Sequence, residues 1–281
     1  MPPWQPPGRI ALVQSILCWQ QTTLPHTRSL AIARCNVLFI FSGEVPELDV
    51  ALQSQLQPQQ ELITIPYSLD DVGSARDAAG YFCAQGIPAR ALTKQSYARS
   101  DRLRDALLKA GSVFLVGGNT YEFLAYARRV SLFAVLRQLE ARGGIIAAES
   151  AGSILLSPHI ATASIPSRNG DHNTPRLSRH SGMGRIPFHI SPHYEPRAPH
   201  ARGDLNELQS LADKTQLPVV VLEDGEGFSM RGTRIVQRVG RPRVLRPQFA
   251  TQRPPTITAK LQPHITLRRL RAPSTVDSLM R

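Results

Sequence analysis

Residues 144–156 read Gly-Ile-Ile-Ala-Ala-Glu-Ser-Ala-Gly-Ser-Ile-Leu-Leu, an apolar run, a short polar interruption and a second apolar run. The first run predicts a buried strand. A serine on a sharp turn between a strand and a helix has a strained backbone that exposes its hydroxyl, and small residues two positions away on either side permit that turn. Ala148 and Gly152 meet this requirement around Ser150, although the usual pattern has glycine at the first position. An ordinary strand-to-helix turn would fit the same residues.

The segments before this stretch alternate between apolar runs and amphipathic runs. Strands are predicted at 37–41, 62–65, 89–92, 112–116 and 144–148, and helices at 46–56, 70–86, 100–110 with Ser100 as its cap, and 121–142. Two later apolar runs, 188–193 and 219–222, predict further strands. A strand-helix-strand alternation of this kind is typical of an α/β fold with a mostly parallel sheet covered by helices.

Composition excludes several classes of protein. The chain has 281 residues and three cysteines without a Cys-x-x-Cys spacing, so neither a disulfide framework nor a zinc finger is indicated. No apolar run approaches the roughly 20 residues of a membrane-spanning helix. We therefore expect a protein of a reducing compartment, cytoplasmic, without a membrane partner, although an acid-free start that contains arginine also resembles a transit peptide.

The net charge of +12 lies entirely at the two ends of the chain. Residues 1–34 carry +3, residues 35–230 carry −2, and residues 231–281 carry +11. Both ends are also rich in proline, which disrupts helices and sheets. We expect a poorly ordered N-terminal extension (1–34), a folded domain (35–240) and a basic Pro/Arg-rich tail (241–281). Nucleic acid is expected as a partner only through this tail, and a solvated tail without a partner is the simpler interpretation.

Chemistry in α/β sheets is found at the carboxyl ends of strands, where three candidate groups lie. Ser150 is the candidate nucleophile, His193 follows the strand predicted at 188–193, and Asp224 follows the strand predicted at 219–222. A serine nucleophile needs a base and a group that orients the base, which His193 and Asp224 can supply. Backbone N–H groups of Gly118 and Ala151 are the expected oxyanion donors.

Two ambiguities concern the neighbouring carboxylates and histidines. Glu223 and Glu226 flank Asp224, and the orienting role could pass to one of them. Six of the eight histidines lie between residues 159 and 200, and His189 and His193 could share a face of a strand. These two side chains could then approach one metal ion, but the sequence shows no carboxylate ligand beside them and no group that would hold their rings in place. We therefore expect neither a metal nor a cofactor.

The motifs together resemble the peptidase E family, which comprises α-aspartyl dipeptidases and related serine peptidases. The resemblance rests on Gly-Gly-Asn-Thr at 117–120, Ser-Ala-Gly at 150–152, Pro-His-Tyr at 192–194 and the turn at 222–225, in the family's order and spacing. It implies a flavodoxin-like three-layer α/β fold akin to class I glutamine amidotransferases, with a nucleophile elbow. It also implies Ser150 as nucleophile, His193 as base, Asp224 as the acid and a short peptide as substrate. The oligomeric state stays open, with a homodimer as one option.

Departures from the family pattern concern the substrate. In aspartyl dipeptidases a Gly-Glu-Thr-Arg segment supplies an arginine for the substrate's aspartate, whereas the matching segment here, 203–206, ends in Asn206. Asn206 cannot form the bidentate pair that selects a carboxylate, and Arg202 is a candidate substitute. Glu149 could bind a substrate ammonium group, and Asn119 is a further candidate substrate contact. The resemblance therefore implies a peptidase but does not extend to a preference for N-terminal aspartate.

The resulting hypothesis is a serine-type dipeptidase, and two alternatives accompany it. One is a cyanophycinase-like hydrolase, although the loop of those enzymes that corresponds to residues 117–120 usually reads Gly-Gly-Asp-Gln, whereas this chain has Gly-Gly-Asn-Thr. The other is an inactive relative whose basic tail binds nucleic acid or another acidic partner.

Overall fold

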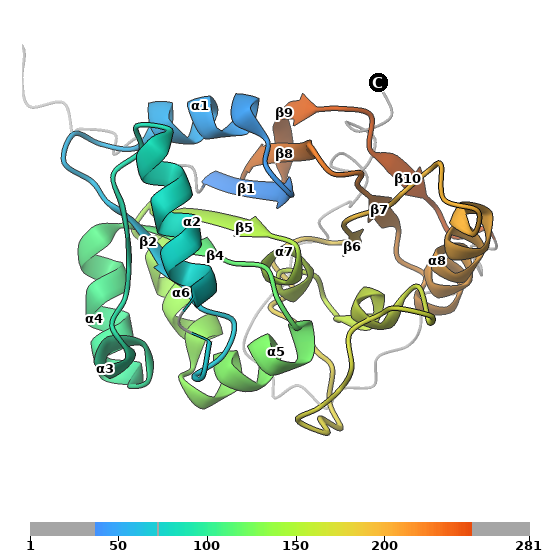
Figure 1. Ribbon diagram of the computed structural model, residues 1–281, viewed down its shortest axis with the longest axis horizontal. Coiled ribbons are helices and arrows are strands. Elements are labelled where there is room, and N and C mark those ends of the chain that lie inside the picture. The colour runs from blue at the N-terminus through green and yellow to red at the C-terminus, as the bar shows by residue number, and fades with distance from the viewer. Residues whose placement is uncertain (1–36, 72, 249–281) are drawn as a thin grey trace, which may run out of the picture. The chain divides into compact units, whose positions relative to one another are not determined.

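The computed structural model describes residues 37–71 and 73–248, and Figure 1 shows the arrangement of their helices and strands. The expectations for residues 1–34 and for the tail beyond residue 248 lie outside the described residues. Within the described ranges, no helix combines the length and the apolar character needed to cross a bilayer.

The central sheet has seven strands in the order β3-β2-β4-β5-β1-β8-β9. Its strands are β1 (Val37–Ser42), β2 (Leu62–Ile65), β3 (Ala89–Ala91), β4 (Ser112–Leu115), β5 (Ile145–Glu149), β8 (Glu226–Arg231) and β9 (Arg234–Val239). The first five pair in parallel, and β8 and β9 add an antiparallel edge. The predicted α/β fold with a mostly parallel sheet is thus confirmed. From β2 to β5 the strands follow the flavodoxin order, and β1, first in sequence, takes the fifth place.

Helices cover both faces of this sheet because its strands are apolar on both sides. Along β1, Phe39 and Phe41 pack on one face with α1 and α2, whereas Leu38 and Ile40 pack on the other with α4 to α7. The helices are α1 (Pro46–Gln55), α2 (Gly73–Ala84), α3 (Lys94–Tyr97), α4 (Ser100–Ala110), α5 (Thr120–Arg129), α6 (Leu132–Ala141), α7 (Ala151–Leu155) and α8 (Ala201–Thr215), with a 3-10 turn at Ala161–Ser164.

A second sheet of three strands, in the order β10-β7-β6, lies beside α8 (Figure 1). It contains β6 (His189–Ser191), β7 (Val219–Val221) and β10 (Arg243–Leu245). One face packs on α8 through Val219 and Val221, and the other joins the main core through Ile190 and Val220. The two strands predicted late in the chain therefore form a separate sheet. Strand β10, inside the segment expected to be a tail, pairs antiparallel with β7.

Two local predictions differ from the structure. The helix predicted at 121–142 is two helices, because Ser131 has a left-handed backbone (φ 55°) that ends the hydrogen-bond ladder between α5 and α6. Ser100 is the first residue of α4 and not its cap, which is Arg99. No side chain caps that helix terminus.

Candidate active site

Ser150 lies on the tight turn between β5 and α7. Its backbone has φ 50° and ψ −116°, a left-handed value that is rare for residues other than glycine. The Ser150 N–H donates to the carbonyl of Phe41 (3.2 Å), and the Ser150 carbonyl accepts from Ile154 N–H (3.0 Å). A Cβ on Gly152 would lie 2.4 Å from the carbonyl oxygen of Leu115, so the helix can approach the sheet only with glycine at this position.

Ser150, His193 and Asp224 form one hydrogen-bonded chain. The Oγ of Ser150 is 2.8 Å from Nε2 of His193, and Nδ1 of His193 is 2.5 Å from Oδ1 of Asp224. His193 follows β6 with φ 58°, and Asp224 follows β7. The side chains of His193 and Asp224 are 45% and 71% exposed, so solvent reaches this chain of contacts.

Ser42, at the carboxyl end of β1, connects this chain of contacts to the central sheet. Its Oγ accepts a hydrogen bond from His193 N–H (3.0 Å), and its carbonyl accepts from Gly225 N–H (2.8 Å). Ser42 is fully buried. Sequence reasoning missed this residue, although its place at a strand end was the available signal.

Of the three carboxylates after β7, Asp224 and Glu226 have separate contacts. Asp224 hydrogen-bonds His193, whereas Glu226 is buried and accepts from the backbone N–H groups of Glu223 (2.9 Å) and Arg241 (2.5 Å). Glu226 thereby joins the turn after β7 to the segment after β9. Of the three, Asp224 is the one in position to orient the histidine.

His189 does not share a site with His193. It is fully buried on β6, with Nδ1 3.1 Å from the carbonyl of His159 and Nε2 3.2 Å from Oγ1 of Thr215. Burial lowers the pKa of this imidazole. Strand β6 ends at Ser191, so His193 lies outside the strand that contains His189, and the structure does not favour the alternative of a shared strand face for these two histidines.

The glycine turn after β4 packs directly against Ser150. A Cβ on Gly117 would lie 3.3 Å from Cβ of Ser150. Gly118 (φ 135°) packs against the ring of Tyr67, because a Cβ on Gly118 would lie 2.2 Å from Cδ1 of that ring. The Asn119 side chain caps α5 by accepting from Tyr121 and Glu122 N–H groups, and it donates to the carbonyl of His172 (3.1 Å). Asn119, a candidate substrate contact, thus has internal partners at both ends of its amide.

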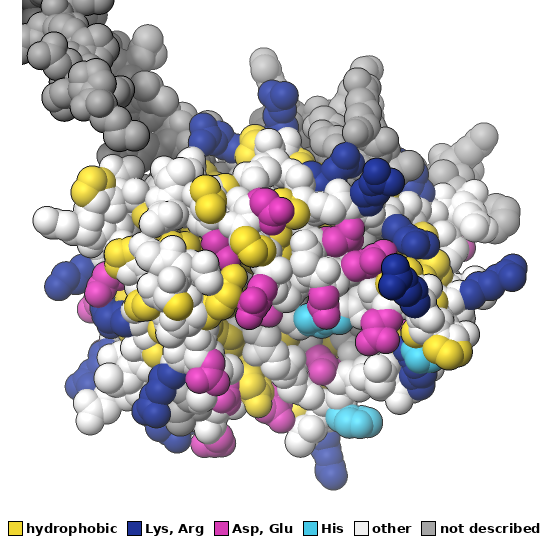
Figure 2. Space-filling view, turned by 45° about the horizontal axis from the view of Figure 1, so that its top comes forward, with side chains coloured by type: hydrophobic (Ala, Val, Ile, Leu, Met, Phe, Trp, Pro, Cys, Tyr) yellow, Lys and Arg dark blue, Asp and Glu magenta, His cyan; other side chains and the backbone are white. Residues whose placement is uncertain are grey.

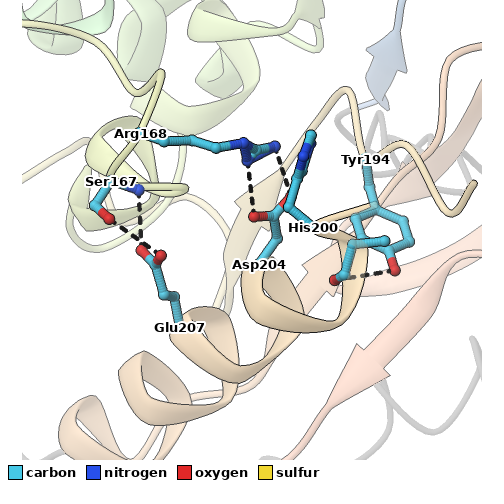
Figure 3. Close-up of polar contacts among 7 residues, drawn as sticks. Ser167, Arg168, Tyr194, His200, Asp204 and Glu207 are labelled. Atoms are coloured by element: carbon cyan, nitrogen blue, oxygen red, sulfur yellow. Dashed lines mark hydrogen bonds and ion pairs between the residues drawn. The ribbon is translucent and has the colours of Figure 1, made fainter. Parts of the chain in front are cut away.

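The loop at residues 167–171 contacts both α8 and the start of α5. Figure 3 shows Ser167 and Arg168 of this loop facing Glu207 and Asp204 of α8. At one end, Glu207 of α8 accepts from the backbone and hydroxyl of Ser167, and Asp204 forms a bidentate pair with Arg168 (2.9 and 2.8 Å). At the other end, Asp171 accepts from Thr120 N–H (2.8 Å). The α8 terminus therefore supports the loop through carboxylates that sequence reasoning did not single out.

Arg202 and Asn206 are exposed residues on the first turns of α8. Neither is among the residues that line a pocket between α1, α2 and the central sheet, next to Ser150. In this structure the two candidate substrate contacts on α8 are therefore separate from that pocket.

The pocket beside Ser150 has a volume of about 360 Å³ and lies between α1, α2 and the carboxyl ends of β1, β4 and β5. Glu149, the residue before Ser150, contributes to its wall. Burial raises the pKa of the Glu149 carboxyl, opposed in part by nearby His193. Sequence reasoning did not identify the other carboxylates of this pocket, which come from α1, α2 and the turn before α1.

Comparison with known proteins gives a consistent relationship. Residues 38–238 match the family model of peptidase family S51. Peptidase E of Shewanella denitrificans is 26% identical over 208 residues, which cover 70% of this chain and 85% of that protein. The "Probable alpha-aspartyl dipeptidase" of Drosophila melanogaster is 27% identical over 186 residues, 62% of this chain and 71% of that protein.

A crystal structure described as a peptidase E protein from Listeria monocytogenes has a TM-score of 0.58 and 19% sequence identity to this chain. The match covers 73% of this chain and all of that one. At this level of identity the match supports the fold alone.

Proposed function

The chain belongs to peptidase family S51, and from this membership we propose that it is a serine-type peptidase that hydrolyses dipeptides or other short peptides. The observation that carries the proposal is the hydrogen-bonded chain from Ser150 through His193 to Asp224, with distances of 2.8 and 2.5 Å. A nucleophile, a base and an orienting carboxylate at these distances are what acyl transfer through a serine requires.

In the proposed mechanism, Nε2 of His193 takes the proton of Ser150 Oγ as the oxygen attacks the peptide carbonyl carbon. Asp224 accepts from Nδ1–H of His193, which leaves Nε2 unprotonated and able to act as the base. The protonated imidazole then gives its proton to the leaving amine, and an acyl group remains on Ser150. Water, activated by the same nitrogen, releases the acid and restores the serine.

The backbone around Ser150 supports its role as a nucleophile elbow. The left-handed φ of 50° presents the side chain outward from the turn, as strained serines do at this position in other hydrolases. We propose the N–H groups of Ala151 and Gly118 as the oxyanion donors, because one follows the nucleophile directly and the other lies on the glycine turn that packs against it.

The test is hydrolysis of a dipeptide library, followed by mass spectrometry, with wild type and the Ser150→Ala variant. The library includes N-terminal Asp, Glu, neutral and basic residues. Ser210→Ala serves as the matched control, because this serine is exposed on α8 and bonds only its own helix. The proposal expects cleavage by wild type and the control and none by Ser150→Ala. Cleavage that survives in Ser150→Ala, or no cleavage of any member by folded wild type, would overturn it.

A further inference from the structure

The pocket beside Ser150 is lined by both aromatic rings and carboxylates. The rings of Phe41, Phe82 and Phe114 contribute apolar surface to it. Four carboxylates also line the pocket: Glu44, Asp49, Asp77 and Glu149. No Lys, Arg or His is among its described lining residues. Figure 2 shows Asp and Glu side chains grouped near the middle of one face of the molecule, with Lys and Arg mainly toward its edges.

Ser150, His193 and Asp224 do not line this pocket themselves, but two of its lining glycines are next to the proposed reaction centre. Gly117 lines it, and a Cβ on that glycine would lie 3.3 Å from Cβ of Ser150. Gly43 also lines it, and a Cβ there would lie 3.4 Å from Oδ1 of Asp224. A group in the pocket would therefore lie next to a peptide bond positioned at Ser150.

Asp49 gives an independent indication of a ligand. Only 3% of this residue is exposed, and Oδ2 accepts from the Tyr81 hydroxyl (2.6 Å). The second oxygen, Oδ1, is buried and has no hydrogen-bond partner in the described protein. A buried carboxylate oxygen without a donor is unfavourable, and Asp49 is one of the residues that line the pocket, so a ligand donor that reached Oδ1 would stabilise it.

We propose that the pocket binds the side chain of a lysine or arginine residue adjacent to the scissile bond, which makes the enzyme selective for short basic peptides. This inference rests on the proposed peptidase function. The aliphatic stem of the substrate would lie along the phenylalanine rings, and its charged head would lie among Asp49, Glu149 and Glu44. The pocket volume of about 360 Å³ falls within the usual range for small-ligand sites.

The electrostatics of the pocket agree with an organic cation. Burial raises the pKa of both Asp49 and Glu149, and each of the two is raised further by other carboxylates around the pocket. A bound guanidinium or ammonium group would compensate that repulsion and favour the ionised carboxylates. Within the described residues, no group of three or more His, Cys, Asp or Glu side chains is placed so that it could hold a metal ion.

The activity test compares substrates that differ in charge and little in shape. Wild type is given Arg-Ala against citrulline-Ala, Lys-Ala against norleucine-Ala, and the same pairs in reversed order. We expect kcat/KM to favour the cationic member by about tenfold or more in at least one order, which corresponds to about 1.4 kcal/mol. Equal cleavage of the charged and neutral members in both orders would overturn the proposal and leave the peptidase function standing.

Variants locate the preference. Glu149→Gln and Glu44→Gln should each reduce the ratio of arginine to citrulline cleavage by several-fold, and Glu44 lies at the exposed rim, where substitution spares the fold. Glu47→Gln is the matched control, because Glu47 is an exposed carboxylate of α1 that does not line the pocket. An unchanged ratio in both pocket variants would contradict the assignment.

A binding measurement separates this inference from the proposed function. Calorimetry with Ser150→Ala protein and arginine amide, against citrulline amide, needs no turnover. We expect binding of the cationic amide alone, weakened in Ser150→Ala/Glu149→Gln protein. Charge-selective binding without any hydrolysis by wild type would refute the peptidase and retain the cation pocket. Equal binding of the two amides, or none of either, would refute the cation pocket.

Discussion

Asp224 bonds His193 at 2.5 Å, yet 71% of its side chain faces solvent. In an Asp224→Asn variant the amide can donate to Nδ1 of His193, which moves the ring proton to Nε2, where it blocks the base. We expect kcat to fall by about 10²–10⁴ with little change in KM. Steady-state kinetics on a cleaved dipeptide measures this, and Glu223→Gln should retain activity. Similar losses in both variants would contradict the assignment of Asp224.

Glu149 is a residue whose pKa is raised by burial, and this has a stability consequence. Between its pKa in the unfolded chain and its higher pKa in the folded protein, the folded state binds more protons. The free energy of unfolding therefore falls as pH rises through that window. Glu149→Gln removes this dependence, so we expect a higher free energy of unfolding than wild type above the window and a smaller difference at acidic pH.

Urea titrations at acidic and at neutral pH check the Glu149 prediction, with Glu47→Gln as the control for the loss of one surface charge. A Glu149→Gln variant that is less stable than wild type at neutral pH would show that the carboxylate has a stabilising partner.

At the scale of elements, two glycines on helices predict opposite effects. A Cβ on Gly152 of α7 would lie 2.4 Å from the Leu115 carbonyl, whereas a Cβ on Gly203 of α8 meets nothing within 4 Å. Gly152→Ala should push α7 from β4, lower the free energy of unfolding by about 1–3 kcal/mol and reduce activity. Gly203→Ala should raise it by about 0.4–1 kcal/mol without affecting activity. Thermal or urea unfolding with a parallel activity assay tests the pair.

Most elements of the central sheet were predictable from the sequence because the pattern that defines them is local. The buried runs at 37–41 and 144–148 correspond closely to β1 and β5. Strands β8 and β9 were not predicted, because neither has a continuous apolar run: β8 is buried between β1 and β9 although it contains Glu226 and Ser229, and β9 is the edge strand with exposed polar positions. The break between α5 and α6 was also missed, since nothing in the amphipathic pattern marks the left-handed Ser131.

At the scale of the whole molecule, Ser42 connects the two sheets at the site through His193 N–H and Gly225 N–H. Ser42→Ala leaves the His193 N–H without its acceptor, which should lower stability by about 1–3 kcal/mol. We also expect kcat to fall by about tenfold to a hundredfold with KM nearly unchanged, because the imidazole shifts relative to Ser150. Ser112→Ala is the control, as Ser112 is equally buried and bonds the Glu61 carbonyl instead. Equal kcat losses in both variants would refute a positioning role for Ser42.

The candidate site was predictable in part. Ser150, His193 and Asp224 each follow an apolar run, and strand ends are where sequence reasoning looks for chemistry. The sequence does not indicate that β6 and β7 lie in a sheet separate from the central one, because the pairing of strands depends on contacts between residues far apart in the chain. The carboxylates Glu44, Asp49 and Asp77 were missed for the same reason, because only the fold brings α1 and α2 to one pocket.

The residues of the proposed reaction centre and the residues of the pocket come largely from different parts of the fold. The side chains of His193 and Asp224 come from loops after β6 and β7, whereas the pocket is formed by α1, α2 and the strand ends of the central sheet. Under the proposed function, substitutions at Glu44 or Asp77 would change which peptides are cleaved and would leave Ser150, His193 and Asp224 unaltered. A laboratory selection confined to α1, α2 and the turn between β1 and α1 should yield altered substrate ranges at undiminished turnover.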